Sequence, residues 1–277
     1  MRLPPTVVTI AGSDSSGGAG IQADLKAIAA NGGYGASVLT AITAQNTMGV
    51  MAAEPVPLPL IRAQLDAVFD DLTVAAVKTG MLADEEIVLL VAEALRARRP
   101  ARYVCDPVMI SKTGFSLLAA GCAAALRREL LPLATLVTPN THEARELAGM
   151  PVETVAQAEE AGRRILETGA AAVLVKGGHL GERPGTDVLV TPEGVRHFPG
   201  EWHDTPHTHG TGCTYSAAIA TQLARGRPLA EAIALAKEFL TEAIRGGLAV
   251  GRGRGPTDPF FFLRAGDRSG WAEKVRR

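Results

Sequence analysis

The sequence predicts an α/β fold, a three-layer α/β/α sandwich with a mostly parallel central sheet. Short apolar runs typical of buried strands recur along the chain, and helical patterns lie between most of them. Strands that alternate with helices of this length imply right-handed crossovers and helices on both faces of the sheet. The length of 277 residues and the hydrophobic content of 47% favour one core. We therefore expect a single domain over residues 1–277, with its core at about 6–255 and a tail, 256–277, left unassigned.

Six apolar runs are the expected parallel strands, at residues 6–11, 37–44, 75–78, 103–106, 136–138 and 171–176. After the first run, Ile21, Leu25 and Ile28 share one helical face. Another helix is expected after Asp84, which is a good N-cap residue. Thr154 and Gln157 have the spacing of a capping box for a third helix.

The alternation of strands and helices changes after residue 186. Residues 187–191 and 195–198 are joined by a Pro-Glu-Gly turn and are typical of an antiparallel hairpin at the sheet edge. Two helices are expected next, over residues 212–224 and 229–245.

Charge and composition exclude several classes of partner. The 28 basic and 29 acidic residues nearly cancel, so no long-range positive field attracts nucleic acid or an anionic membrane. No run approaches the roughly 18 apolar residues of a membrane span. Three cysteines, an odd number without a CxxC pair, suit a reducing compartment. We expect a cytoplasmic protein that recognises a small molecule.

Polar residues and glycines gather where the expected strands end. Ligands bind beyond the carboxyl ends of strands in open parallel sheets, so these segments are the expected site. They are residues 12–20, 45–46, 80–82, 106–112, 140–143 and 176–179.

Residues 18–23 match the GxGxxG/A pattern of a dinucleotide-binding loop. Nothing acidic lies between Asp24 and Glu54, so the usual ribose anchor about 20 residues downstream has no candidate. No GxxxxGK[ST] P-loop is present either. We interpret the loop as one that folds over a ligand rather than as a nicotinamide or flavin site; a plain tight turn is the alternative.

Residues 208–214 precede an Ala-rich helix and contain two glycines, Gly210 and Gly212. A helix N-terminus with free N–H groups can bind an anion such as a transferring phosphoryl group, although an ordinary cap has the same pattern. Cys213 lies in this first turn, where a helix N-terminus lowers the pKa of a thiol. It is the candidate base for a substrate hydroxyl, and an inert buried thiol is the alternative.

Candidate metal ligands are of two kinds. His203, His207 and His209 with Asp204 fit no zinc spacing. Asp106 and Glu143 follow different strands and offer hard oxygen ligands for Mg²⁺, while Asn140 with Glu143 could equally be a capping pair. Lys176 ends an apolar strand, where an unpaired charge is costly, and a phosphate group would pair with it.

Several sequence blocks in order carry a resemblance to a known family: residues 11–26, 43–47, 80–82, 106–109, 138–140, 176–179 and 209–213. Together the blocks resemble the bacterial hydroxymethylpyrimidine/phosphomethylpyrimidine kinases of thiamine biosynthesis, which are ribokinase-like. The resemblance spans about residues 6–255. It implies a kinase that uses MgATP to phosphorylate 4-amino-5-hydroxymethyl-2-methylpyrimidine and then its monophosphate, and it suggests a homodimer.

The resemblance also implies roles for individual residues. Gln45 would bind the aminopyrimidine through its amide, and the rest of its pocket would be Gly12, Asp24, Met81 and Val108. The catalytic and phosphate-facing groups would be Cys213, Lys176, Gly210, Thr211 and Gly212. The metal and nucleotide region would hold Asp106, Glu143, Asn140 and Lys237. Thr43 departs from the family pattern, because an apolar residue is expected against the ring.

Two alternatives to this function stay open. Relatives with the same loops include pyridoxal kinases, whose substrate also carries a hydroxymethyl group. A protein of another class would bind the pyrimidine without turnover. Cys213, where sugar kinases of the superfamily carry Asp, argues against a sugar substrate.

Overall fold

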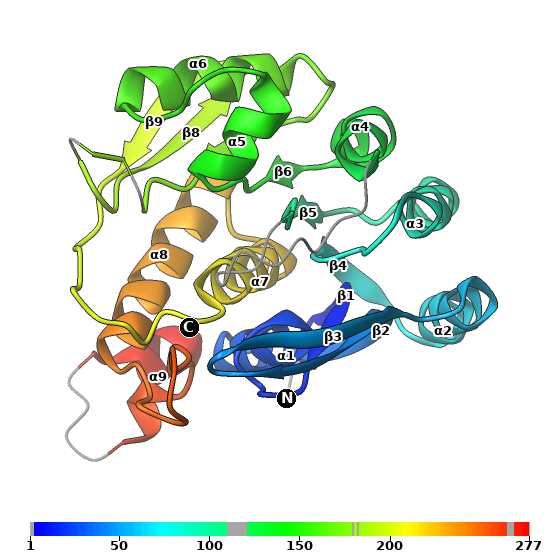
Figure 1. Ribbon diagram of the computed structural model, residues 1–277, viewed down its shortest axis with the longest axis horizontal. Helices are drawn as coiled ribbons and strands as arrows, with labels where there is room; N and C mark the ends of the chain where they lie inside the picture. The colour runs from blue at the N-terminus through cyan, green and yellow to red at the C-terminus, as the bar shows by residue number, and fades with distance from the viewer. Residues whose placement is uncertain (1–2, 110–120, 179, 182, 265–268, 277) are drawn as a thin grey trace.

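The computed structural model describes residues 3–109, 121–178, 180–181, 183–264 and 269–276, and it has the three expected layers (Figure 1). The described strands form one sheet, in the order β3 (Gly49–Pro55), β2 (Tyr34–Asn46), β1 (Thr6–Asp14), β4 (Val74–Thr79), β5 (Tyr103–Cys105), β6 (Leu136–Val137), β7 (Val173–Val175), β8 (Asp187–Thr191) and β9 (Gly194–Phe198).

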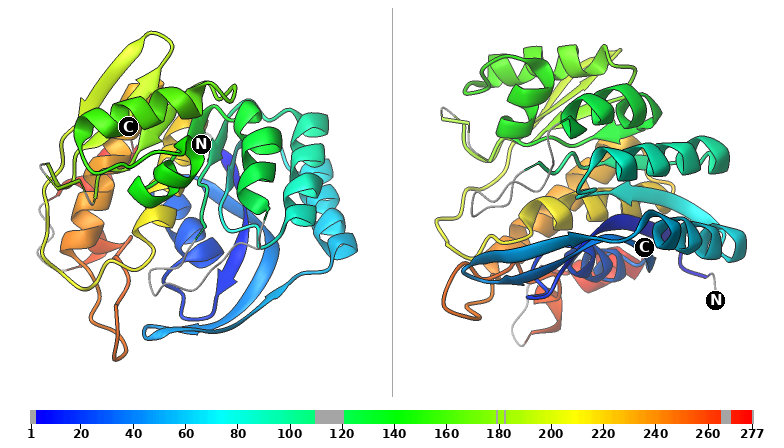
Figure 2. Two further views of the ribbon diagram at one scale, coloured as in Figure 1. Left: turned by 45° about the horizontal axis from the view of Figure 1, so that its top comes forward. Right: turned by 45° about the vertical axis from the view of Figure 1, so that its right-hand side comes forward.

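The central strands, from β2 to β7 in this order, pair in parallel, as the alternating sequence pattern predicts. The expected hairpin is present, because β8 is antiparallel to both β7 and β9. The sequence did not predict β3, which pairs antiparallel with β2 at the opposite edge. Figure 2 shows β2 and β3 as a long ribbon that projects beyond the helices.

Helices cover both faces of the sheet. One face packs against α2 (Leu58–Asp71), α3 (Glu85–Arg98), α4 (Cys122–Ala125) with its continuation Leu126–Leu133, α5 (Thr141–Ala148) and α6 (Val155–Leu166). The other face packs against α1 (Gly20–Ala30), α7 (Thr211–Ala224) and α8 (Leu229–Arg245). Each face has its own buried apolar cluster. No helix in the described ranges is both long and apolar enough to cross a membrane.

The helix starts that the sequence predicts are confirmed. The Asp84 carboxylate accepts a hydrogen bond from the N–H of Ile87 at the start of α3. Thr154 and Gln157 form both bonds of a capping box at the start of α6. Each cap satisfies backbone donors that a helix leaves unpaired.

The tail extends the core beyond residue 255. Its last helix, α9 (Trp271–Arg276), begins with Trp271, which is 1% exposed. The indole N–H of Trp271 donates to the carbonyl of Ala30, and its ring centroid lies 5.1 Å from that of Phe239 in α8. These buried aromatic contacts stabilise the packing of the tail against α1 and α8.

Candidate active site

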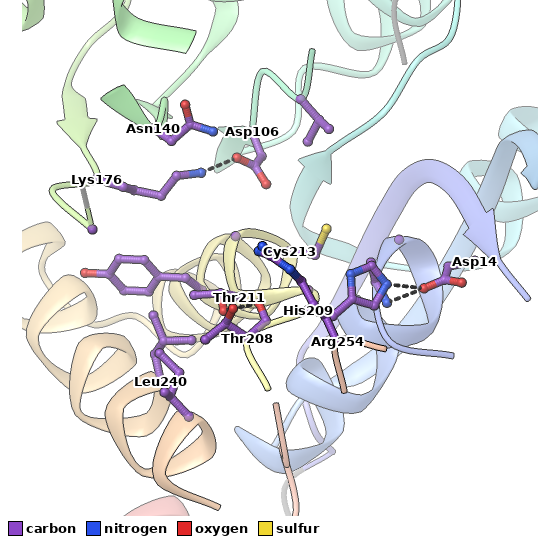
Figure 3. A pocket seen from close by; sticks show the side chains of 18 of the residues that line it. Asp14, Asp106, Asn140, Lys176, Thr208, His209, Thr211, Cys213, Leu240 and Arg254 are labelled. Atoms are coloured by element: carbon purple, nitrogen blue, oxygen red, sulfur yellow. Dashed lines mark hydrogen bonds and ion pairs between the residues drawn. The ribbon is translucent and has the colours of Figure 1, made fainter. Parts of the chain in front are cut away.

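The strand ends surround a large pocket with a cavity of about 470 Å³. It is lined from the ends of β1, β2 and β4, from the segments after β5, β6 and β7, and from the start of α7 (Figure 3). The structure brings together all but one of the candidate residues here: Gly12, Thr43, Gln45, Met81, Asp106, Val108, Asn140, Glu143, Lys176, Gly210, Thr211, Gly212, Cys213 and Lys237. Residues 110–112 and His179, also expected at this rim, lie outside the described residues.

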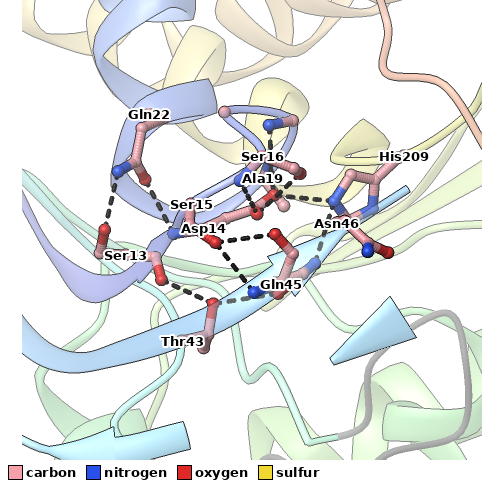
Figure 4. A network of polar contacts seen from close by, with 12 residues as sticks. Ser13, Asp14, Ser15, Ser16, Ala19, Gln22, Thr43, Gln45, Asn46 and His209 are labelled. Atoms are coloured by element: carbon pink, nitrogen blue, oxygen red, sulfur yellow. Dashed lines mark hydrogen bonds and ion pairs between the residues drawn. The ribbon is translucent and has the colours of Figure 1, made fainter. Parts of the chain in front are cut away.

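The glycine-rich loop at the start of α1 is held by its own carboxylate (Figure 4). Asp14 accepts hydrogen bonds from the N–H groups of Ser16, Gly18 and Ala19. It also lies 2.8 Å from Nε2 of His209. Burial alone would raise the pKa of Asp14, but the bonds from His209 and Ser16 outweigh it and lower the pKa to about 2. Amides bonded to this anion are not available to a diphosphate, which argues against a dinucleotide at this loop.

Gln45 reaches the pocket from β2, and its amide oxygen has a hydrogen-bond donor beside it. Its Oε1 accepts from the Thr43 hydroxyl at 3.2 Å, and its Nε2 lies 3.1 Å from Nε2 of His209. The same Thr43 hydroxyl proton is shared with the carbonyl of Ser13, at 2.9 Å. The unexpected threonine thus orients Gln45 by hydrogen bonding, which an apolar residue could not do.

Gly12 and Met81 form an apolar part of the pocket wall. A Cβ atom on Gly12 would lie 3.0 Å from the Met81 sulfur, so a larger residue there would push the Met81 side chain aside. Val108 also lines this end of the pocket and is partly exposed. A flat ring between an apolar wall and a fixed amide would have both packing and hydrogen-bond partners.

Asp24 does not reach the pocket surface, unlike the other expected substrate contacts. Its side chain is 0% exposed and forms an ion pair with Lys78, which is also 0% exposed. Both Asp24 oxygens accept from the Lys78 ammonium, at 3.0 and 2.8 Å, and Thr9 donates to the same carboxylate. Burial lowers the pKa of Lys78, but the Asp24 charge outweighs it and raises that pKa. Lys78, which the sequence did not single out, lines the pocket floor instead.

Lys176 lies between two carboxylates, Asp106 directly after β5 and Glu143 in the first turn of α5. Its ammonium is 2.7 Å from Asp106 and 3.9 Å from Glu143. Burial would raise the pKa of Asp106, but Lys176 and Lys78 lower it. Burial and the Asp106 charge raise the pKa of Glu143 to about 7, against the attraction of Lys176. Asp106 therefore neutralises the positive charge of Lys176, for which the sequence alone indicated no protein partner.

Asn140 and Glu143 form the capping box of α5. The Asn140 side chain accepts from the Glu143 N–H, and the Glu143 carboxylate accepts from the Asn140 N–H. The two readings of this pair are compatible, because one Glu143 oxygen caps the helix while the carboxylate still lines the pocket. No group of three or more His, Cys, Asp or Glu residues suited to a metal occurs in the described part of the chain.

Asp106 and Glu143 nevertheless fit Mg²⁺. This ion keeps several waters and takes one or two carboxylates together with substrate phosphates, so it does not need a cage of protein ligands. A neighbouring dication would also hold Glu143 in its charged form.

The first turn of α7 faces the middle of the pocket. Gly210 has a φ of 74°, and a Cβ atom there would lie 1.8 Å from the carbonyl oxygen of Gly18, so only glycine allows α7 to begin against the loop. The Thr211 N–H and hydroxyl both donate to the carbonyl of Thr208. Within the described residues, the N–H groups of Gly212 and Cys213 donate no backbone hydrogen bond. Of the expected anion-binding amides, those of residues 210–212, the amide of Thr211 is already bonded, whereas those of Gly210 and Gly212 donate no backbone hydrogen bond among the described residues. The amide of Cys213 joins them.

The prediction of a lowered pKa for Cys213 is wrong for the ligand-free protein. Burial, together with the charges of Asp24 and Asp106, raises the pKa of its thiol to about 11. The Lys78 cation and a hydrogen bond from the Gly20 backbone act in the opposite direction but do not outweigh burial. Cys213 is partly exposed, whereas Cys105 and Cys122 are buried.

Lys237 marks the other end of the pocket, on α8. Its ammonium donates to Asp187 and to the carbonyl of Gly185, both at 2.6 Å. Tyr215 donates to the same Asp187 carboxylate. Leu240 and Ile244 line this end as well, so it combines an apolar surface with a cation and suits a nucleotide.

The histidines considered for zinc have separate roles. His209 bonds Asp14, and Nδ1 of His207 accepts from the N–H of Gly255. His203 lies 3.7 Å from Glu201. Sequence reasoning missed the part that His209 plays, because its partner is 195 residues away.

Comparison with known proteins identifies the relatives of this chain. The family model for phosphomethylpyrimidine kinase matches residues 14–258. The hydroxymethylpyrimidine/phosphomethylpyrimidine kinase of Rhizobium meliloti is 51% identical over 260 residues, which are 91% of this chain and 96% of the relative. A thiamine biosynthesis bifunctional protein of Geobacter sulfurreducens is 48% identical over 91% of this chain, and the chain spans 52% of that longer protein.

Two solved structures have the same fold. Bacillus subtilis pyridoxal kinase in an ADP complex is 40% identical, with a TM-score of 0.86 over 94% of this chain and 98% of that one. Phosphomethylpyrimidine kinase from Clostridium difficile is 45% identical, with a TM-score of 0.78 over 87% of this chain and 99% of that one. The fold is therefore shared with a pyridoxal kinase and with a phosphomethylpyrimidine kinase.

Proposed function

Because the chain belongs to the phosphomethylpyrimidine kinase family, we propose that it phosphorylates 4-amino-5-hydroxymethyl-2-methylpyrimidine and then its monophosphate, with ATP as donor, in thiamine biosynthesis. One observation carries the proposal. The amide of Gln45, the ammonium of Lys237 and the start of α7 line the same pocket. The acceptor and the γ-phosphoryl group of ATP would meet at the start of α7.

The acceptor end supplies recognition. The Gln45 amide offers one donor and one acceptor, which complement the ring nitrogen and amino group of an aminopyrimidine. The Thr43 hydroxyl orients that amide before the substrate binds, so less freedom is lost on binding.

The start of α7 supplies the chemistry. The alcohol oxygen attacks the γ-phosphorus, the bond to the ADP oxygen breaks, and the hydroxyl proton passes to Cys213 as the thiolate. At neutral pH only a small fraction of a thiol with a pKa of about 11 is ionised, but that fraction is a strong base. The N–H groups of Gly212 and Cys213, with Lys176, stabilise the charge on the transferred group.

Mg²⁺ would be held near Asp106 and Glu143, with Asn140 fixing the Glu143 carboxylate. When bound, the ion would neutralise charge on the nucleotide phosphates.

Pyridoxal is the second candidate acceptor, since a pyridoxal kinase is 40% identical to this chain. Measuring kcat/KM for pyridoxal and for the aminopyrimidine under the same MgATP decides between them. A higher value for the aminopyrimidine supports the proposal, and a higher value for pyridoxal overturns the substrate assignment.

A protein that only bound the pyrimidine would have no nucleotide site. Calorimetric titration with ATP tests this class directly. Binding of ATP supports the kinase, and its absence, together with binding of the pyrimidine, would indicate a non-catalytic binding protein.

We also propose a homodimer in the cytoplasm. The β2–β3 ribbon exposes large apolar side chains, with Ile42 56%, Met48 60% and Met51 63% exposed. Apolar surface of this kind is suited to a second copy of the chain. Sedimentation gives the mass in solution, and a monomer at all concentrations would contradict the dimer.

A further inference from the structure

The cations of the pocket differ in how they are neutralised. Lys78 is paired with Asp24, Lys176 with Asp106, and Lys237 with Asp187. Arg254 also lines the pocket, and among the described residues its guanidinium forms no ion pair with a carboxylate. Figure 3 shows the Arg254 side chain extending from its loop into the pocket, on the side where His209 lies.

The backbone of the loop that carries Arg254 is fixed on both sides. The Arg254 N–H donates to the carbonyl of Thr47 at 2.9 Å, and the Gly253 N–H donates to the Thr47 hydroxyl. On the other side, the Gly255 N–H donates to His207, and the Gly255 carbonyl accepts from the His209 N–H. The loop therefore bridges the β2–β3 ribbon, which carries Gln45, and the segment that leads into α7.

Glycines on each side of Arg254 allow this close packing. A Cβ atom on Gly253 would lie 2.1 Å from the Thr47 carbonyl oxygen, and one on Gly255 would lie 1.8 Å from that of Leu248. The Gly-Arg-Gly sequence thus holds the backbone tightly while the arginine projects.

The second phosphorylation places a new demand on this pocket. The monophosphate brings a charge of about −1.5 to −2 into a cavity that already holds Asp14, Asp106 and Asp187. The three lysines are neutralised by carboxylates, so this charge needs a further cation.

We propose that Arg254 binds the phosphate group of the monophosphate in the second step, and so determines whether the enzyme can use this acceptor. This inference rests on the proposed two-step function. A phosphate oxygen attacks the γ-phosphorus of ATP, the bond to the ADP oxygen breaks, and a diphosphate forms. The planar guanidinium suits a phosphate group because it can donate two parallel hydrogen bonds.

Arg252 offers a matched control. It belongs to the same loop, it is exposed like Arg254, and it does not line the pocket. If the positive charge of the loop acts only in general, Arg252→Ala and Arg254→Ala should have the same effect. If Arg254 binds the phosphate group, only Arg254→Ala should impair use of the monophosphate.

The test compares Arg254→Ala, Arg254→Lys and Arg252→Ala, with the alcohol and the monophosphate as separate acceptors. For Arg254→Ala we expect KM for the monophosphate to rise about 10- to 100-fold, as for loss of a charge-assisted bond. In Arg254→Ala, KM for the alcohol and KM for ATP should stay within about twofold of wild type. Arg254→Lys should recover part of the loss with the monophosphate, and Arg252→Ala should behave as wild type. An equal loss with both acceptors, a raised KM for ATP alone, or no loss would each overturn the proposal.

Calorimetry without ATP separates this inference from the proposed function. If the wild-type protein binds the monophosphate but phosphorylates neither acceptor, the proposed kinase activity is overturned. The Arg254 site is then tested by binding affinity alone. Arg254→Ala should then lose affinity for the monophosphate and retain affinity for the alcohol. Equal affinity of wild type and Arg254→Ala for the monophosphate would overturn the site.

Discussion

The carboxylate of Asp14 lies 2.8 Å from the imidazole of His209, although 195 residues separate them. Asp14 also binds three amides of the glycine-rich loop, and His209 contacts the amide of Gln45. This one pair therefore links the loop, the Gln45 side chain and the segment before α7.

The lowered pKa of Asp14 predicts an acid-sensitive contribution to stability. Because the pKa is about 2 in the folded protein and 3.8 ordinarily, the stabilisation is present above pH 4 and is lost as pH falls toward 2. The shift corresponds to about 2 kcal/mol. The variant Asp14→Asn lacks this carboxylate and its stabilisation. The difference in free energy of unfolding between wild type and Asp14→Asn should therefore shrink as pH falls from 5 to 2. Urea unfolding at several pH values measures this, and parallel curves would contradict it.

The buried pair of Lys78 and Asp24 predicts a large effect on stability. Lys78→Met leaves the Asp24 charge unpaired at a position with 0% exposure, which costs about 3–5 kcal/mol. The free energy of unfolding, measured with urea, should fall by this amount.

Two further variants test that explanation. Lys78→Met combined with Asp24→Asn removes both charges and should recover most of the stability. The control is Lys26→Met, at an exposed lysine that donates to the Gly17 carbonyl. Its free energy of unfolding should fall far less than that of Lys78→Met. A double variant as unstable as Lys78→Met would show that the packing, and not the charge, is responsible.

Cys213→Ala should affect the two phosphorylation steps differently. The alcohol must lose a proton to react, whereas the monophosphate already carries ionised oxygens near neutral pH. We expect kcat for the first step to fall about 10²- to 10⁴-fold and kcat for the second to change little. KM for ATP should barely move, and Cys213→Asp should recover part of the first step.

Cys122→Ala, at a buried thiol outside the pocket, is the control and should keep both activities. Alkylation by iodoacetamide reports the ionisation of Cys213 directly, because only the thiolate reacts. The rate should keep rising to pH 10, as expected for a pKa of about 11. A plateau by pH 8, or equal loss of both steps in Cys213→Ala, would contradict the account.

Gln45→Leu should weaken use of the pyrimidine and leave ATP binding intact. Loss of the amide leaves the ring's donor and acceptor unpaired, which predicts a fall of about 10- to 100-fold in kcat/KM. Gln64→Leu is the matched control, because Gln64 bonds the backbone of Leu39 outside the pocket. Unchanged kcat/KM in Gln45→Leu would remove this residue from the site.

Much of the fold and pocket follows from local patterns in the sequence. Apolar runs and caps such as Asp84 depend on neighbouring residues only. Parallel strands end at one edge, so Gln45, Asp106 and Lys176 could be placed in one pocket before any contact was known.

The features that the sequence did not reveal depend on distant partners. Asp24 has the position of a pocket residue, but its pairing with Lys78, 54 residues away, draws it into the core. The thiol of Cys213 has a helix N-terminus beside it, but burial and the two nearby aspartates decide its pKa. Arg254 lies in a glycine-rich segment without periodicity, and contacts of its loop with Thr47, His207 and His209 bring it to the pocket.

The most direct test of the central claim follows one reaction mixture over time. The purified protein is incubated with MgATP and 4-amino-5-hydroxymethyl-2-methylpyrimidine, and the products are identified by phosphorus NMR. The account predicts that the monophosphate appears first and is then converted to the diphosphate, with one ADP released at each step. Release of no ADP, with the alcohol or with added monophosphate, would contradict it.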